Sequence, residues 1–500
     1  MEIISLNRRD QIFSIVSFLI ILIFHFFCIE FYPVNDEFIF PVGAKLIESK
    51  DINLIKSFFD FNANTLGFST LIFLVSKIIH LEYYLLGKIL SVTGLIFIFF
   101  GIINFLKIIS FKPKIELYYL ILLIFLNPLI FNFSLRATPD FFSMSVIFLS
   151  VSMLIRFKNK FSTFFNILII SMATFIKPFN FIFILLIFKD LNYSYLYSKN
   201  NFRLIYIFIL TLFISASLFL FNYYLFNFLI IPENFELAKD FEILSYCVQL
   251  ISYVGILNIF ISPIYLNLIL SNIKKNMVRY MFYLITSLFL SYFLMFRVGE
   301  IDFGFLTEYL NINFYLFLLT MSFFVFVDTI FSIYKKNIAN NKLFINYFLI
   351  LIILLIFLSN FHPTQRYLLI LIPFSTLFFY LINQSKITIL IAVLIYFLAN
   401  IPLFINHYST QKNIGIVLNF LMKEKIISQT YPGFLGQHSL NYFMINNENS
   451  KIEVNKNILF NKNKKFNISD LKPFDAKDII FVSKSQNIFK RNKNIYIYKN

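Results

Sequence analysis

Cysteine, tryptophan, glycine and histidine are scarce in this chain. Its 500 residues include two cysteines, no tryptophan, 11 glycines and five histidines. Cys28 and Cys247 lie in separate apolar segments, which excludes a disulfide framework and a paired-cysteine metal site. The histidines are dispersed without ligand spacing, so we expect no metal and no cofactor. They are His25, His80, His362, His407 and His438.

Two further absences limit the possible functions. No glycine-rich loop of the kind that cradles phosphate is present, which argues against a nucleotide-dependent cytoplasmic reaction. No nucleic-acid-binding motif is present either, so we expect no nucleic-acid partner.

Apolar residues are abundant instead. The chain is 59% hydrophobic and only 14% charged, and apolar runs of membrane-spanning length recur almost to residue 405. This composition predicts a mainly α polytopic membrane protein. Phenylalanine alone accounts for 72 residues, so an aromatic stripe in this chain is core or lipid contact by default.

Basic residues beside the apolar runs predict the topology. Arg8 and Arg9 precede the run Ile12–Phe31, which has no small-residue cleavage pattern after it and therefore predicts a retained cytoplasmic-to-outside anchor. An integral, multi-pass protein of a bacterial inner membrane is expected, with a cytoplasmic N-terminus. Alternation continues through ten further spans and one re-entrant pair with Lys177-Pro178 at its apex, giving about 13 transmembrane or half-spanning helices. The expected segments are Tyr83–Leu106, Tyr118–Ser134, Phe141–Ile155, Phe161–Phe188 (re-entrant), Leu204–Ile230, Leu244–Leu270, Tyr280–Phe296, Leu310–Ile333, Phe344–Leu358, Tyr367–Leu381 and Ile387–Ile405.

The tail has a different composition. Residues 407–500 carry fifteen Lys or Arg against six Asp or Glu, and the short runs Ile479–Ser483 and Ile495–Tyr498 predict strands. We expect a transmembrane domain over 1–406, with a first outer loop at 32–82, and a small extracytoplasmic α+β domain over 407–500. The positive surplus would suit anionic lipid head groups or a simply solvated face.

Charged residues gather on the expected outer side. Asp36 and Glu37 follow the first span, and Lys88 and Lys177 lie in helical segments, where burying an ammonium without a partner is costly. The other residues on this side are Arg136, Asp140, Arg297, Glu300, Asp302, His362 and Arg366.

The chain resembles the C-type (GT-C) integral-membrane glycosyltransferases, among them the protein O-mannosyltransferases and the lipid A aminoarabinose transferases. The resemblance lies in the order and common sidedness of five features. They are the Asp36-Glu37 pair, a long outer loop with amphipathic pieces (Phe38–Glu48 and Leu66–Ile79), Leu86-Gly87-Lys88, Arg136-Ala-Thr-Pro-Asp140 with Phe175-Ile-Lys-Pro178, and His362-Pro-Thr-Gln-Arg-Tyr leading to Phe374.

The resemblance implies a GT-C-like fold and hexosyl or pentosyl transfer from a polyprenyl-phosphate donor to a lipid, glycan or protein acceptor. Asp36 matches the family's catalytic acidic residue and would act as the base, with Glu37 as the alternative base. Cations would neutralise the leaving phosphate. The substrate- and phosphate-binding candidates are Lys88, Arg136, Asp140, Lys177, Arg297, His362 and Arg366.

Other interpretations of these residues stay open. Asp36 would otherwise be a solvated loop residue, and Asp140 suits either substrate positioning or the start of a helix at Thr138-Pro139. Lys88 and Lys177 would otherwise snorkel to the interface, and His362 with Arg366 would form an interfacial anchor pair. The chain lacks the downstream Tyr and Gly-rich run of well-matched members, which leaves sugar and acceptor open.

Two other classes of protein share these properties. A flippase or exporter of lipid-linked saccharides is also polytopic and basic, but usually has an even number of spans and no outer domain. An O-antigen polymerase or ligase tends to carry a large outer loop late in the chain, whereas here the long outer loop comes first.

Overall fold

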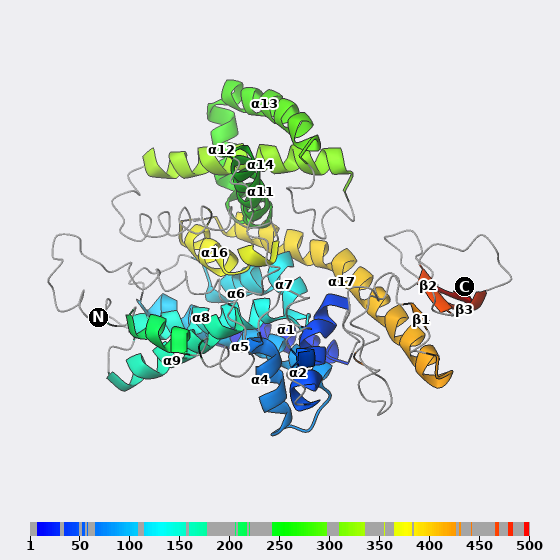
Figure 1. Ribbon diagram of the computed structural model, residues 1–500. Coiled ribbons are helices and arrows are strands. Elements are labelled where there is room, and N and C mark those ends of the chain that lie inside the picture. Colours follow the sequence, from blue (N-terminus) through cyan, green and yellow to red (C-terminus); the bar gives the residue numbers. More distant parts are fainter. Residues whose placement is uncertain are drawn as a thin grey trace.

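The computed structural model is mainly helical, with one small sheet near the C-terminus (Figure 1). The structure describes most of the helices but not the whole chain. The described residues are 8–30, 35–49, 66–108, 115–156, 160–177, 243–297, 310–335, 365–382, 385–426, 430–431, 466–469, 479–483 and 495–499, with short pieces at 53–55, 58, 206, 209–217, 220, 355 and 442.

Six helical stretches in this described part are long and apolar enough to cross a membrane. They are Arg9–Phe27, Tyr83–Lys107, Ile243–Lys275, Met277–Met295, Ile312–Ile333 and Lys386–Lys423. The expectation of a multi-pass membrane protein is confirmed at this level. Of the expected span Leu204–Ile230 only residues 206, 209–217 and 220 are described, and the expected span Phe344–Leu358 lies outside the described residues except for residue 355.

The segment expected to form the first outer loop contains helices at the predicted places. After α1 (Arg8–Phe27), the 3-10 helix η1 (Asn35–Phe38) leads into α2 (Ile39–Ser49), and α4 (Gly67–Ser76) follows. α2 and α4 pack against each other and against α5 (Tyr83–Ile108). Together they form a small helical layer beside the start of α5.

The predicted span Tyr118–Ser134 consists of two helices with a bend of 62° between them. α6 (Leu117–Phe125) ends before Asn127, whose side chain caps α7 (Pro128–Ser134) by accepting a hydrogen bond from Leu129 N at 3.1 Å. A proline lacks the N–H that would continue α6 and favours the first position of a new helix.

α5 and α8 (Pro139–Arg156) pack closely along a stripe of glycines. Gly87, Gly94 and Gly101 are seven residues, or about two turns, apart and so share one face of α5. A Cβ at Gly94 would lie 2.5 Å from Ser145 Oγ, and one at Gly101 would lie 2.5 Å from the Phe148 ring. Small residues therefore set the helix separation, as is common in membranes.

A second group of helices, α11 to α14, lies at the top of Figure 1. The predicted span Leu244–Leu270 is divided by a 3-10 turn at Ser262-Pro263, and the group is held together around a buried carboxylate. Asp328 is 2% exposed and accepts hydrogen bonds from Arg279 Nη1 and Tyr280 Oη, both at 2.8 Å. The elements are α11 (Ile243–Ile261), η3 (Ser262–Tyr265), α12 (Leu266–Lys275), α13 (Met277–Met295) and α14 (Ile312–Lys335).

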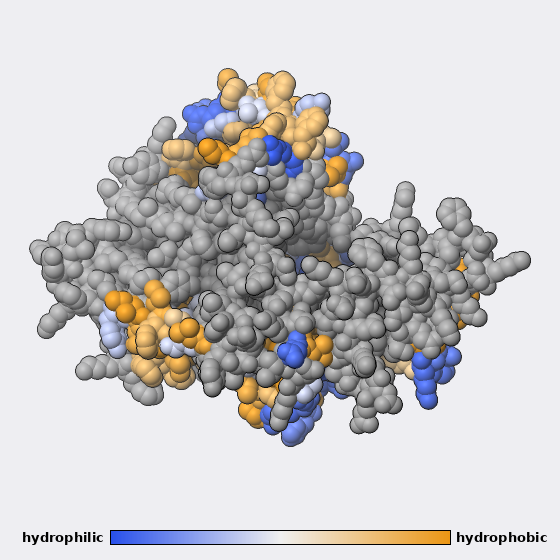
Figure 2. All heavy atoms as spheres, viewed as in Figure 1, coloured by the Kyte–Doolittle hydropathy of each residue, from blue (hydrophilic) through white to orange (hydrophobic). Residues whose placement is uncertain are grey.

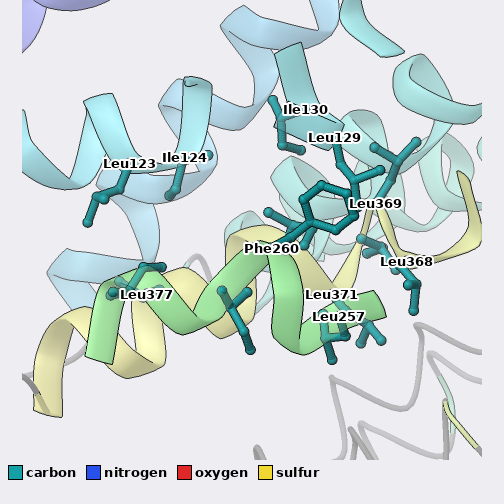
Figure 3. Packing of buried hydrophobic residues seen from close by; sticks show 14 of the residues in the cluster. Leu123, Ile124, Leu129, Ile130, Leu257, Phe260, Leu368, Leu369, Leu371 and Leu377 are labelled. Atoms are coloured by element: carbon teal, nitrogen blue, oxygen red, sulfur yellow. The ribbon is translucent and has the colours of Figure 1, made fainter. Parts of the chain in front are cut away.

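The two helical groups meet at α16 (Leu371–Ile382) and α17 (Lys386–Lys423), which lie between them in Figure 1. Figure 3 shows the apolar packing at this junction, to which α6, α7, α11, α16 and η7 (Gln365–Leu368) contribute. Phe260 of α11 and Leu369, just after η7, are almost fully buried there. This packing places η7 beside α7 and α8.

α17 is much longer than the predicted span Ile387–Ile405. Its 38 residues run without a break through the expected domain boundary at residue 407 and extend about 57 Å. A hydrocarbon layer of about 30 Å accounts for roughly the first twenty residues. The remaining turns are available to pack against the tail.

The tail forms a four-stranded sheet in the order β1-β2-β4-β3. The predicted strands at 479–483 and 495–498 are confirmed, and they pair antiparallel. Ile495, Ile497 and Phe481 pack against the C-terminal half of α17, so this half of the helix belongs to the unit that contains the sheet. The strands are β1 (Thr430–Tyr431), β2 (Phe466–Ser469), β3 (Ile479–Ser483) and β4 (Ile495–Lys499).

Apolar side chains cover the outward faces of the membrane helices. On α13, Phe289 is 74% exposed and Val278 is 85% exposed, and Figure 2 shows this apolar surface at the top of the view. The face of α17 that includes Ile387, Leu394 and Phe397 is similarly exposed. Such surfaces are stable when lipid covers them.

Candidate functional site

η1 brings Glu37 into a buried site at the N-terminal end of α5. The side chain is 2% exposed, and its Oε2 accepts a hydrogen bond from the backbone N–H of Ala137 at 3.2 Å. Lys88, in the second turn of α5, is 1% exposed and close enough to attract the Glu37 carboxylate. The Glu37 carboxylate therefore connects the first loop with α5, through Lys88, and with the turn between α7 and α8, through Ala137.

The position of Lys88 depends on the glycine that precedes it. A Cβ at Gly87 would lie 3.1 Å from the Cβ of Ala137, so α5 rests directly on the α7–α8 turn here. Ser91, one turn further on, donates a hydrogen bond to the Thr138 carbonyl at 3.3 Å. Close backbone packing thus places the ammonium of Lys88 beside that turn.

An ion pair holds the residue at the start of α8, just after the same turn. Asp140 is in the first turn of α8 and pairs with Lys177, which follows the C-terminal end of α9 (Lys160–Ile176). Their side chains are 3% and 14% exposed. The predicted helix start at Pro139 is confirmed, and Asp140 also has this partner about 37 positions along the chain.

Gly67 fixes the end of α9 that presents Lys177. The first residue of α4 lies so close to that end that a Cβ at Gly67 would be 2.4 Å from the Phe175 carbonyl oxygen and 2.7 Å from Ile176 Cα. No side chain fits in this contact between two backbones. α4 therefore packs against the end of α9 that Lys177 follows.

η7 adds aromatic and basic groups. The Lys177 ammonium lies 4.7 Å from the centre of the Tyr367 ring, and the Arg366 guanidinium lies 5.6 Å from the same ring. The two cations are close enough to repel each other. An anionic ligand between them would relieve that repulsion.

The α7–α8 turn also holds polar groups suited to a ligand. Arg136 packs over the Phe133 ring at 4.9 Å, while its Nε and the hydroxyl of Thr138 are buried and have no hydrogen-bond partner among the described residues. A buried donor left without an acceptor costs about 1–3 kcal/mol. A ligand with acceptor oxygens would satisfy both groups.

One residue of this neighbourhood, His407, was not among the sequence-predicted site residues. It was assigned to the start of the tail, but α17 continues through it and places it within electrostatic range of Arg136 and Lys88. Its Nε2 lies 2.8 Å from Gln411 Nε2, one turn further along. The signal in the sequence was this polar pair at a spacing of four beyond the last apolar run.

The structure brings together Glu37, Lys88, Arg136, Asp140, Lys177 and Arg366, which we call the charged cluster. Within it, four basic side chains face two acidic ones, so it favours an anion. The backbone of Asp36 lies in η1, directly before Glu37, but its side chain and all of His362 are outside the described residues. Arg297 follows the C-terminal end of α13, which belongs to the group α11 to α14.

In the part of the chain that the structure describes, no three His, Cys, Asp or Glu side chains come close enough to hold a metal ion. The groups available for a ligand are therefore the ammonium, guanidinium and hydroxyl donors of the cluster. Their chemistry suits phosphate or carboxylate oxygens.

The chain matches no protein-family model, no curated protein and no solved structure. Any functional assignment depends on the residues of this chain themselves.

Proposed function

We propose that this protein is a membrane glycosyltransferase that moves a hexose or pentose from a polyprenyl-phosphate donor to a lipid, glycan or protein acceptor. The observation that carries the proposal is the charged cluster. Its six side chains come from five separate segments, all of which the basic-residue pattern assigns to one side of the membrane. Random surface charges would not gather at the ends of apolar helices.

The cations of the cluster would bind the phosphate of the donor. Lys88 and Lys177 each already face one carboxylate, whereas Arg136 and Arg366 supply the surplus positive charge. With the Thr138 hydroxyl, they offer donors to the phosphate oxygens. Neutralising the charge that develops on the leaving phosphate is the main catalytic requirement, since phosphate is already a good leaving group.

Asp36 would act as the base. The acceptor hydroxyl attacks the anomeric carbon, its proton passes to the carboxylate, and the bond from that carbon to the phosphate oxygen breaks with inversion of configuration. Glu37 is held by Ala137 N–H and Lys88, which favours an anchoring role for it and leaves the adjacent Asp36 for the chemistry. Glu37 is the alternative base.

The architecture in this proposal is GT-C-like, with about 13 transmembrane or half-spanning helices and a C-terminal domain outside the cytoplasm. The short α9, which ends just before Lys177, and the long α17, whose second half packs on the sheet, both support it. The protein would lie in a bacterial inner membrane with its N-terminus in the cytoplasm.

The test is a transfer assay with purified protein in nanodiscs, a panel of polyprenyl-phosphate sugars and a lipid extract as acceptor. Consumption of one donor with release of polyprenyl phosphate is the expected result. Arg136→Gln should raise the KM for that donor about tenfold or more, because a charge-assisted hydrogen bond to phosphate is lost. Lys386→Gln, which changes an exposed cation that pairs with Glu116, is the control and should leave this KM unchanged.

Two results would replace the proposal. Movement of a saccharide lipid across liposomes without its consumption would indicate the flippase or exporter. Extension or transfer of a preassembled polysaccharide, with no use of single-sugar donors, would indicate the polymerase or ligase.

A further inference from the structure

Tyr442, from the tail, is bound to the first outer loop by its backbone, its ring and its hydroxyl. Lys45 of α2 donates a hydrogen bond from Nζ to the Tyr442 carbonyl oxygen at 2.7 Å. The same ammonium lies 3.6 Å from the centre of the Tyr442 ring. The hydroxyl donates to Glu82 Oε2 at 2.6 Å, just before α5 begins.

The ring fills an apolar pocket built by the loop. Tyr442 is 1% exposed, and its ring centre lies 5.3 Å from that of Phe38 and 5.8 Å from that of Tyr84. Val42 and Leu46 of α2 line the same pocket and are fully buried. A tyrosine ring buried in this way stabilises the packing more than an exposed ring would.

The hydroxyl of Tyr442 is suited to its role as a donor. Burial, and then the hydrogen bond to Glu82, raise the pKa of Tyr442, so the phenol stays protonated across the physiological range. Through its bonds to Lys45 and Glu82, Tyr442 thus connects α2 with the start of α5.

Both of these parts lead to the charged cluster. Phe38, against which the Tyr442 ring packs, is the residue after Glu37 in η1. Lys88, which attracts Glu37, lies in the second turn of the helix that begins just after Glu82. A shift of either part would change the distance from Glu37 to Ala137 N–H and to Lys88.

We infer that Tyr442 is a positioning residue that holds η1 and the start of α5 in register, so that the tail sets the position of Glu37. Its importance for sugar transfer rests on the proposed function. Its effect on the position of Glu37 does not rest on the proposed function, because that effect is measured at the hydrogen bond from Ala137 N–H to Glu37.

The experiment therefore reads the position of the loop directly. Full-length wild type, Tyr442→Ala and Tyr442→Phe are compared by acylation of lysines with an amine-reactive ester at pH 8 and by hydrogen exchange at Ala137. Lys45 is 4% exposed and should be protected in the wild type, whereas the Lys77 side chain is 52% exposed and serves as the internal reference. Tyr496→Ala, a tyrosine of β4, is the matched control.

In Tyr442→Ala we expect Lys45 to become about tenfold or more reactive relative to Lys77, and Ala137 to exchange faster. The amides of Leu117 and Tyr118, which Asp10 caps at the other end of the helices, should stay unchanged. Tyr442→Phe keeps the ring and the carbonyl and should preserve the protection of Lys45. If transfer is also measured, kcat should fall about tenfold or more in Tyr442→Ala with little change in the donor KM, and Tyr442→Phe should recover most of it.

Two results would overturn the inference. One is a protected Lys45 in Tyr442→Ala, and the other is an exposed Lys45 with unchanged exchange at Ala137. A wild type that transfers no sugar from any donor would refute the proposed function alone, since acylation and exchange would still decide the role of Tyr442.

Discussion

The ion pair between Asp140 and Lys177 is expected to be a strong and cooperative contact. Its side chains are only 3% and 14% exposed, and Lys177 also lies 4.7 Å from the Tyr367 ring. Removing one partner of a buried pair leaves the other charge uncompensated, at a cost of about 3–5 kcal/mol. Lys177→Met and Asp140→Asn should therefore each lower the free energy of unfolding by roughly this amount.

The double variant distinguishes pairing from simple loss of contacts. Replacing a buried pair with uncharged residues of similar volume is often nearly neutral, so Lys177→Met with Asp140→Asn should cost about 1–2 kcal/mol. With single costs of about 3–5 kcal/mol and a double cost of about 1–2 kcal/mol, the coupling energy is about 4 kcal/mol or more, which is above the usual range for residues in contact.

Reversible unfolding in mixed micelles, titrated with a denaturing detergent, measures these differences. The matched control is Lys77→Met, because Lys77 pairs with Glu48 at 2.7 Å and lies 4.9 Å from the Phe73 ring, but both of its paired side chains are half exposed. An exposed pair is worth about 0–1 kcal/mol. Additive costs at Lys177 and Asp140, or a loss in Lys77→Met as large as in Lys177→Met, would refute the reasoning.

Two further variants test how the outer loop supports the site. Gly67→Ala should destabilise the protein by about 1–3 kcal/mol, because its Cβ would lie 2.4 Å from the Phe175 carbonyl oxygen, and an unchanged melting temperature would contradict this contact. Burial lowers the pKa of Lys45 from its usual value of 10.5 to about 8, despite the attraction of Glu82 and Glu48. Between about pH 8 and 10.5 the Lys45 side chain is therefore protonated in the unfolded chain more than in the folded protein. Its contribution to stability is constant below about pH 8 and rises with pH above it. Lys45→Met should lose this rise in melting curves recorded from pH 7.5 to 9.5, whereas curves parallel to the wild type would contradict it.

Much of the membrane organisation follows from apolar runs and basic flanks. The outer-loop helices expected at 38–48 and 66–79 correspond to α2 and α4, because their apolar periodicity is local information. Averaged hydropathy concealed the bend at Asn127-Pro128, although the proline itself was a readable signal. The length of α17 was not readable in this way, because packing on the strands, rather than an apolar run, continues the helix past Ile405.

The site was predictable as a set of residues but not as a geometry. Common sidedness assigned Glu37, Arg136, Asp140, Lys177 and Arg366 to one face, and the structure brings them together. Their pairing depends on backbone contacts that no local pattern reveals, such as the approach of Gly67 to the end of α9. His407 was missed for the related reason that its helix was expected to end before it.

Sugar transfer with Asp36, the residue before Glu37, as the base is tested most directly by the release of polyprenyl phosphate from a labelled polyprenyl-phosphate sugar. Wild type, Asp36→Asn and Asp10→Asn are compared, Asp10 being an acid that instead accepts a hydrogen bond from Leu117 N at 2.9 Å. Acceptor-dependent release that falls about 10²–10⁴-fold in Asp36→Asn and persists in Asp10→Asn is the predicted result. Undiminished release by Asp36→Asn would contradict the account.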